Sequence, residues 1–309
     1  MTIPLLIDTD PGVDDALALL MALAEPAVEI VALTIAAGNV GLDHTVANAL
    51  KLLEVCDSRV PVYPGAPAPL LHPAEDAAFV HGRDGFGDTG YTPAARHAEA
   101  EHAALAMLRL SHRHAGRLQM VMLGPLTNLA LALKLDPTLP QRVERLVIMG
   151  GAVTGRGNTT VPAEFNIGFD PEAAHVVFSA WPRFDLVDWE ATLRHPWPLP
   201  EFEGWLAADS PRARFYDAIS RSTRAWSAAR HGGEWHSADG LAMAVALEPQ
   251  SIDESFERAV AIELEGRLTR GATIVDWEQR SDQHRQCRIV TRFDPARFRA
   301  RVQAALAIP

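Results

Sequence analysis

From its first residues, the chain alternates between short apolar runs of strand length and segments in which apolar residues recur with helical spacing. Short apolar runs predict strands at Pro4–Ile7, Glu29–Ile35, Val60–Tyr63, Leu118–Leu123, Leu146–Met149 and Phe184–Val187. Helical spacing between these runs predicts helices at Val13–Ala24, His44–Val55, Leu126–Leu135 and Pro171–Phe178. This rhythm is typical of parallel βαβ units with right-handed crossovers. We therefore expect an α/β fold with an open, mostly parallel sheet flanked by helices.

Two further segments, one without periodicity and one mainly helical, interrupt this alternation of strands and helices. Pro64–Pro93 is rich in Gly, Pro and His and has no clear period, so we expect a long functional loop. Pro196–Trp235 is predicted to be mainly helical. Further strands are predicted at Ala259–Leu264, Thr273–Trp277 and Cys287–Phe293, before a last helix at Pro295–Leu306. Because composition does not break anywhere, we expect residues 1–309 to form a single domain.

Charge and cysteine content narrow the possible partners and compartment. The net charge of −11 disfavours nucleic acid and anionic membranes, because both would repel the chain. Cys56 and Cys287 lie far apart, which argues against a disulfide scaffold and fits a reducing compartment. The start resembles no signal peptide, and the apolar run Ala16–Ala24 is too short to span a bilayer. We expect a cytoplasmic protein.

The segment Asp8-Thr9-Asp10-Pro11-Gly12-Val13-Asp14-Asp15 carries the strongest chemical signal. Asp8 and Asp10 fall where the first strand ends, and Asp14 and Asp15 fall in the first turn of the next helix. Like charges this close repel one another by about 4 kcal/mol at 4 Å and intermediate dielectric, so a shared cation or bound protons are required. The motif offers only oxygen ligands, which favours Ca²⁺ or Mg²⁺ over zinc.

A simpler interpretation of this segment is a helix start with acidic residues in its first turn. A helix N-terminus favours negative charge by up to about 1 kcal/mol at an exposed site. That stabilisation would account for one or two aspartates. It does not account for four within eight residues at the carboxyl edge of a strand, so we favour the functional interpretation.

Several further motifs follow in a characteristic order. Together with the opening motif they are Asn39, His81-Gly82-Arg83-Asp84-Gly85, Leu123-Gly124-Pro125-Leu126-Thr127-Asn128, Met149-Gly150-Gly151-Ala152, Asn158, Glu164-Phe165-Asn166 and Asp239. With this set, the chain resembles the inosine–uridine-preferring nucleoside hydrolase family. The resemblance extends from residue 3 to about residue 249 and implies hydrolysis of the N-glycosidic bond of ribonucleosides to free base and ribose. It also implies a homodimer or homotetramer.

The resemblance implies a role for each of these residues. Asp10, Asp15, Asp239 and the backbone carbonyl of Leu123 would hold Ca²⁺, which would also take the attacking water and the ribose 2′- and 3′-hydroxyls. Asp10 would act as the general base on that water. Asp14 and Asn166 would bind the 2′- and 3′-hydroxyls. The remaining sugar contacts are implied for Asn158 and Glu164 at the 5′-hydroxyl and for Asn39 and Met149 along the ribose.

Taken singly, these residues have plainer explanations. Asp239 could cap the helix that follows it, and Asn158 could serve a turn among glycines. Glu164 and Asn166 could be solvated loop residues. Asp8 could brace the loop through hydrogen bonds, and we leave it outside the metal site. Only the whole set favours the functional interpretation.

The chain departs from the family pattern on the side of the leaving base. Family members that accept both inosine and uridine carry a His directly before the late metal-binding Asp, and here Ala238 occupies that position. Three explanations remain open: His81 or His236 supplies the proton, the base stacks on Trp226 or Trp235, or the substrate is unlike inosine. The two tryptophans could equally be helix-packing residues. The preferred base therefore stays open.

Two other functions compete with the hydrolase. An Asp-x-Asp after a first strand also marks haloacid dehalogenase-like phosphohydrolases, but neither Lys51 nor Lys134 lies in a plausible site loop. The second alternative is a ribosyl- or Ca²⁺-binding homologue without turnover, which the missing His before Asp239 supports.

Overall fold

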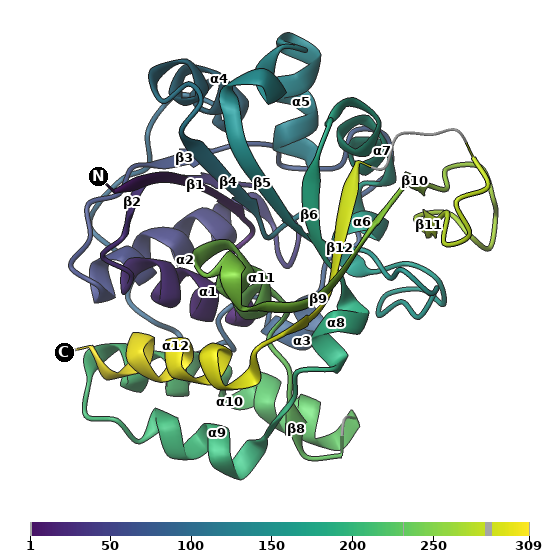
Figure 1. Cartoon of the computed structure of the whole chain (residues 1–309). Coiled ribbons are helices and arrows are strands. Elements are labelled where there is room, and N and C mark those ends of the chain that lie inside the picture. Colours follow the sequence, from purple (N-terminus) through teal and green to yellow (C-terminus); the bar gives the residue numbers. More distant parts are fainter. Residues whose placement is uncertain (1, 231, 282–285, 309) are drawn as a thin grey trace.

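One twisted sheet forms the centre of the molecule. The computed structural model describes residues 2–230, 232–281 and 286–308 (Figure 1). Seven strands are mutually parallel, and the edge strand β9 is antiparallel to its neighbour β12. The strand order is β3 (Val62–Pro64), β2 (Val28–Ile35), β1 (Ile3–Thr9), β4 (Leu118–Met122), β5 (Val143–Met149), β6 (Phe184–Val187), β12 (Cys287–Phe293) and β9 (Ile252–Arg258).

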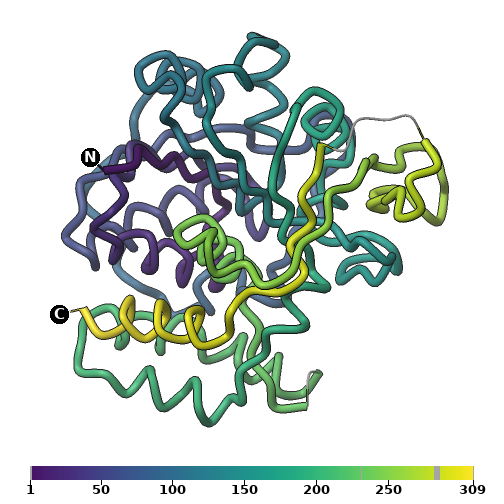
Figure 2. Tube along the Cα trace, viewed as in Figure 1, coloured from purple at the N-terminus to yellow at the C-terminus, as the bar shows by residue number. Residues whose placement is uncertain are grey.

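Helices cover both faces of the sheet, because successive strand residues point to opposite sides. In β1, Leu5 and Ile7 pack into one core cluster and Leu6 packs into the other. The first layer contains α1 (Val13–Leu23), α2 (Leu42–Val55), α9 (Leu199–Leu206), α10 (Pro211–Arg230), α11 (Ala238–Leu247) and α12 (Pro295–Ala307). The second contains α4 (Ala103–Arg113), α5 (Thr127–Leu135) and α7 (Pro171–Ala180). Figure 2 shows the sheet running between these layers.

Short elements complete the described chain. Single-turn helices are α3 (Ala78–His81), α6 (Phe165–Phe169) and α8 (Trp189–Leu193), and 3₁₀ turns occur at Leu139–Arg142 and Pro249–Ser251. Two small antiparallel pairs stand apart from the main sheet. They join β7 (Trp197–Pro198) to β8 (Glu234–Trp235) and β10 (Val260–Ile262) to β11 (Thr273–Val275).

The strand order creates a switch point beside β1. The chain proceeds from β1 through β2 to β3 on one side, and from β4 through β5 to β6 on the other. In open α/β sheets, ligands bind outside the carboxyl ends of the strands at such a point. The segment Asp8–Asp15 leaves β1 there, and Leu123 follows β4 at the same edge.

The predicted fold class is confirmed, but several elements differ from the prediction, and the helix α4 (Ala103–Arg113) was not predicted. The predicted strands Ala259–Leu264 and Thr273–Trp277 are present in shorter form as β10 and β11, which pair with each other outside the main sheet. The sequence pattern missed β9, because its residues Ile252–Arg258 are mostly polar and exposed at the sheet edge. In the described part of the chain, no helix is both long and apolar enough to cross a membrane.

Candidate active site

The turn between β1 and α1 holds its acidic residues through local hydrogen bonds. Gly12 caps α1, and its backbone N–H donates to Oδ2 of Asp15 at 2.9 Å. The hydroxyl of Thr9 donates to Oδ1 of the same carboxylate. Asp15 is fully buried at the N-terminus of α1, where the helix dipole favours its negative charge. We call residues 8–15 the acidic turn.

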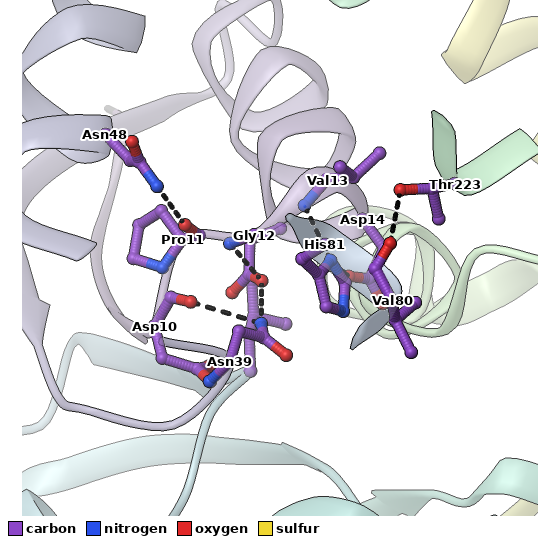
Figure 3. Close-up of polar contacts among 12 residues, drawn as sticks. Asp10, Pro11, Gly12, Val13, Asp14, Asn39, Asn48, Val80, His81 and Thr223 are labelled. Atoms are coloured by element: carbon purple, nitrogen blue, oxygen red, sulfur yellow. Dashed lines mark hydrogen bonds and ion pairs between the residues drawn. The ribbon is translucent and has the colours of Figure 1, made fainter. Parts of the chain in front are cut away.

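The carboxylate of Asp10 lies in a slot that only glycines leave open. A Cβ on Gly38 would lie 2.0 Å from Oδ2 of Asp10, and a Cβ on Gly124 would lie 2.3 Å from Oδ1. The backbone N–H of Asn39 donates to Oδ2 of Asp10 at 2.6 Å. The Asn39 amide then donates to the Asp10 carbonyl at 3.1 Å and to Asp15 at 2.9 Å (Figure 3). Asn39 therefore fixes Asp10 relative to Asp15.

Three carboxylates converge next to this slot. Oxygen atoms of Asp14, Asp15 and Asp239 all lie within 4.8 Å of one another. Asp239 belongs to the first turn of α11, with Ser237 as the capping residue, so the alternative that Asp239 caps this helix is wrong. Asp10 is not part of this trio. It is nevertheless close to it, because its charge raises the pKa of Asp239 and the charge of Asp15 raises the pKa of Asp10.

Burial makes the charged forms of these groups costly. Burial first, and neighbouring carboxylates second, raise the pKa of Asp10 and of Asp239 well above the usual range for aspartate. The same two causes raise the pKa of Asp15 to about 6, and burial raises the pKa of Asp14. Such a group of carboxylates must hold protons or a cation, since each ionised member disfavours the ionisation of the others.

Asp8 is outside the trio and braces the turn through hydrogen bonds. Its Oδ2 accepts hydrogen bonds from the Thr34 hydroxyl at 2.7 Å and from the Asn128 amide at 2.9 Å. The Asn128 amide also donates to the Ile35 carbonyl, and its oxygen accepts from the backbone N–H of Ala66. These bonds join the ends of β1 and β2 to the start of α5.

A cavity of about 400 Å³ opens directly above the carboxylates. It is lined by most of the residues that the sequence singled out, while Asp10 and Asp15 lie beneath its floor. The lining residues predicted from the sequence are Asp14, Asn39, His81, Leu123, Met149, Asn158, Glu164, Asn166, Trp226, Trp235, His236 and Asp239. The fold therefore gathers these dispersed positions around one space.

One wall of the cavity is polar and tightly braced. The Asn166 amide donates to the carbonyl of Leu123 at 2.6 Å and to the carbonyl of Met149 at 3.3 Å. Glu164 caps α6 and accepts from the backbone N–H groups of Gly151, Asn166 and Ile167. Burial raises the pKa of Glu164 to about 7. Because Glu164 and Asn166 are buried, the alternative that they are solvated loop residues is wrong. Asn158 is exposed, and its side-chain oxygen accepts a hydrogen bond from the backbone N–H of Phe165, which is a structural role in its loop.

The opposite wall is aromatic, and the sequence interpretation recovered it only in part. The α10 residues Thr223, Trp226, Ser227 and Arg230 line the cavity at helical spacing, a periodic face that the sequence could have revealed. The guanidinium of Arg230 lies 4.4 Å from the centre of the Trp226 ring. Phe79, 71% exposed, lies 6.3 Å from that ring at the cavity mouth. No signal in the sequence marked Phe79, Val80 or Trp189, and Phe165 was noted only as the middle residue of the motif Glu164-Phe165-Asn166.

The remaining base-side residues differ in environment. Trp235 is 2% exposed and stacks on Phe202 at 5.3 Å, so its ring belongs mainly to the core and reaches the cavity at one edge. His236 and Ala238 both line the cavity, and the His236 ring lies 6.4 Å from the Trp189 ring. His236 therefore brings an imidazole to this side of the cavity, although the family's histidine position is occupied by Ala238.

Comparisons with known proteins identify the family of this chain. Residues 5–300 match the sequence model of the family described as inosine-uridine preferring nucleoside hydrolase. This chain belongs to that family. It is a hydrolase acting on N-glycosyl compounds, so the phosphohydrolase alternative is wrong.

Relatives and solved structures align with this hydrolase along nearly its whole length. The non-specific ribonucleoside hydrolase RihC of Salmonella enteritidis is 35% identical over 303 residues, covering 98% of this chain and 97% of the relative. A plant nucleoside hydrolase, PpNRh1, superposes with a TM-score of 0.93 at 30% identity and covers both chains completely. An inosine-guanosine nucleoside hydrolase superposes with a TM-score of 0.92 at 33% identity and 99% coverage of each chain.

Proposed function

We propose that this hydrolase cleaves the N-glycosidic bond of ribonucleosides in a Ca²⁺-dependent reaction and releases free base and ribose. The observation that carries the proposal is the Asp14–Asp15–Asp239 trio, of which Asp14 and Asp239 line the floor of a cavity with one polar and one aromatic wall. A ribonucleoside has the same division, because its sugar is a ring of hydroxyls and its base is a flat aromatic group. The polar wall suits the sugar, and the aromatic wall suits the base.

The donor set of the floor fits a hard cation. It consists of carboxylate oxygens and one backbone carbonyl, without a thiol or imidazole among the proposed ligands Asp10, Asp15, Asp239 and Leu123. Oδ1 of Asp14 is buried and has no hydrogen-bond partner within the described residues, so it is available to a cation or to a substrate hydroxyl. The Leu123 carbonyl accepts from Asn166 and keeps a second lone pair.

The chain's own residues divide the chemistry between them. When bound, Ca²⁺ supplies the positive charge that favours the ionised carboxylates and orients water and hydroxyl oxygens. Asp10 is proposed to accept the proton of the attacking water, since its carboxylate is held rigidly by Asn39. Asp14 and Asn166 are proposed to bind the 2′- and 3′-hydroxyls, and Glu164 with Asn158 the 5′-hydroxyl. Asn39 and Met149 would line the ribose.

The leaving base needs help from the other wall. Trp226, partly exposed beside Phe79, offers a face on which a base can stack. His236 lines the same wall, and its Nε2 lies 3.8 Å from a carboxylate oxygen of Glu234. We propose that His236 donates a proton to the leaving base. It would replace the histidine that the family pattern has at the position of Ala238.

A substrate and metal panel tests the proposal. Purified protein should release reducing sugar from at least one of inosine, adenosine, guanosine, uridine and cytidine. A chelator should abolish this release, and Ca²⁺ should restore it more completely than Mg²⁺ or Zn²⁺. Absence of turnover across the panel with Ca²⁺ present would refute the proposal. Calorimetric binding of a nucleoside without any release would instead establish the non-catalytic ribosyl-binding alternative.

A further inference from the structure

The side chain of Asn48 connects two loops that contribute to the cavity. Asn48 belongs to α2 and is fully buried. Its Nδ2 donates to the carbonyl of Pro11 in the acidic turn and to the carbonyl of Asp84, both at 2.8 Å. Its Oδ1 accepts from the hydroxyl of Tyr91. Each hydrogen of one amide group thus holds a different loop, and Figure 3 shows the bond to Pro11.

The loop held through Asp84 is the one that carries His81. We call residues 81–91 the His81 loop. Within it, the backbone N–H of Gly87 donates to the His81 carbonyl at 2.8 Å, and Oδ1 of Asp84 accepts from the backbone of Phe86 and Asp88. These bonds make the loop internally stiff. We therefore expect a displacement at Asp84 to move His81 at the cavity wall as well.

The His81 loop approaches the Asn48 side chain closely at Gly85, where only a residue without a side chain fits. Gly85 has a φ of +79°, and a Cβ on it would lie 2.7 Å from Nδ2 of Asn48. A β-carbon at Gly85 would thus push the loop away from the amide. Gly85 both adopts the left-handed conformation and leaves the space that the amide occupies.

The two loops differ in how firmly they are anchored without Asn48. The acidic turn has three further hydrogen bonds from Asn39, to Asp10 and Asp15. Within the described residues, the only direct hydrogen bond between the turn and the His81 loop runs from the backbone N–H of Val13 to Nδ1 of His81 at 3.1 Å. Losing Asn48 should therefore shift the His81 loop and leave the acidic turn in place.

We propose that Asn48 is a positioning residue that keeps His81 in register with the acidic turn, so that substrate contacts both loops in one productive geometry. The catalytic part of this inference rests on the proposed ribonucleoside hydrolysis. Asn48 acts through His81 and touches neither substrate nor the carboxylates. Misplacement of a reacting or orienting group by about 1 Å costs on the order of a hundredfold in rate.

A double-mutant cycle with His81 tests the catalytic part. Asn48→Ala should lower kcat/KM by roughly tenfold to a hundredfold when His81 is present. In the His81→Ala background the same substitution should change kcat/KM by less than about twofold, because coupled residues do not add. An equal loss in both backgrounds would mean that Asn48 does not act through His81 and would overturn the proposal. Asn48→Ser serves if Asn48→Ala does not fold.

Two control variants separate positioning from stability. Tyr91→Phe removes the bond to Oδ1 of Asn48 but leaves both Nδ2 bonds, so kcat/KM should stay within about twofold of wild type. Thr45→Val removes a buried hydroxyl from the same helix, whose bonds run to Ala36 and Leu42 and not to either loop. It should lower the melting temperature without a comparable loss of kcat/KM. A loss in Thr45→Val matching that of Asn48→Ala would assign the effect to stability alone.

Hydrogen exchange tests the positioning independently of any turnover. In Asn48→Ala, amides of residues 81–91 should exchange faster than in wild type, while those of β4 (Leu118–Met122) should be unchanged. Unchanged exchange in residues 81–91 would overturn the positioning role even if the enzyme is active. If wild type hydrolyses no nucleoside, the proposed function fails, and the exchange result still decides whether Asn48 holds the loop.

Discussion

The backbone N–H of Val13 donates a hydrogen bond to Nδ1 of His81 at 3.1 Å, across 68 residues of sequence. A ring nitrogen that accepts a hydrogen bond carries no proton, so the proton of the neutral imidazole lies on Nε2. Burial lowers the pKa of His81 to about 4, against a smaller raising effect of Asp15. At neutral pH, His81 is thus an uncharged ring with a defined tautomer at the cavity wall.

This tautomer predicts how His81 behaves in catalysis. His81→Ala should lower kcat/KM by roughly tenfold to a hundredfold, equivalent to about 1–3 kcal/mol for one lost hydrogen bond. The pH profile between 5.5 and 8 should keep its shape, because His81 remains uncharged throughout this range. Steady-state kinetics of both proteins across that range measure this. A limb of the wild-type profile that disappears in His81→Ala would contradict the neutral assignment.

The neighbouring imidazole should behave in the opposite way. If His236 protonates the leaving base, His236→Ala should lower kcat by about 10²–10⁴-fold with natural nucleosides. It should have much less effect with p-nitrophenyl riboside, because that leaving group departs without protonation. The ratio of the two substrates' rates in His236→Ala and in wild type is the measurement. Equal losses with both substrates would assign His236 a binding role only.

The slot around Asp10 predicts an unusual sensitivity to a single methyl group. Gly124→Ala places a Cβ 2.3 Å from Oδ1 of Asp10, so the carboxylate or the loop after β4 must shift. We expect kcat to fall by at least about a hundredfold, as for a misplaced catalytic group. Gly204→Ala is the matched control, because a Cβ there meets no atom within 4 Å and the position is helical. That variant should keep full activity and should unfold at the same or a higher temperature.

Asp10 itself should be needed for turnover and not for folding. Asp10→Asn keeps the size of the side chain and an oxygen that can accept from the Asn39 backbone N–H. It removes the proposed base, for which a loss of about 10²–10⁴-fold in rate is typical. Without added metal, its melting temperature should equal or exceed that of wild type, because one of several crowded carboxylates is gone. Retained turnover would contradict the assigned role.

Asp188 predicts a pH dependence of stability away from the metal ligands. Burial raises the pKa of Asp188 to about 6, whereas an unfolded aspartate titrates near about 3.9. The folded protein therefore binds the proton more tightly, and this contribution to stability is complete below about pH 4 and is lost as pH rises through 6. Relative to Asp188→Asn, wild type should lose stability between pH 4.5 and 7.5. Urea unfolding of both proteins measures this, and a constant difference would refute it.

The aromatic wall shows where local sequence stops being informative. Trp226 and Arg230 lie one helical turn apart, and that spacing is visible in the sequence. Which helix face meets the cavity depends on how α10 packs against α1, α9 and α12, which no local pattern encodes. Phe79 reaches this wall from a separate single-turn helix, so its contribution could not be read from spacing at all.

By itself, the sequence determined the alternation of strands and helices and the acidic turn, because both follow from periods and turn residues that span fewer than about twenty positions. The resemblance to the hydrolase family likewise rested on short motifs in order. Only the tertiary structure decided that Asp239 meets Asp14 and Asp15, that Asn166 contacts Leu123, and that Asn48 bridges Pro11 and Asp84. These pairs are distant in the chain, and the strand order of the sheet with the packing of α11 and the His81 loop brings them together.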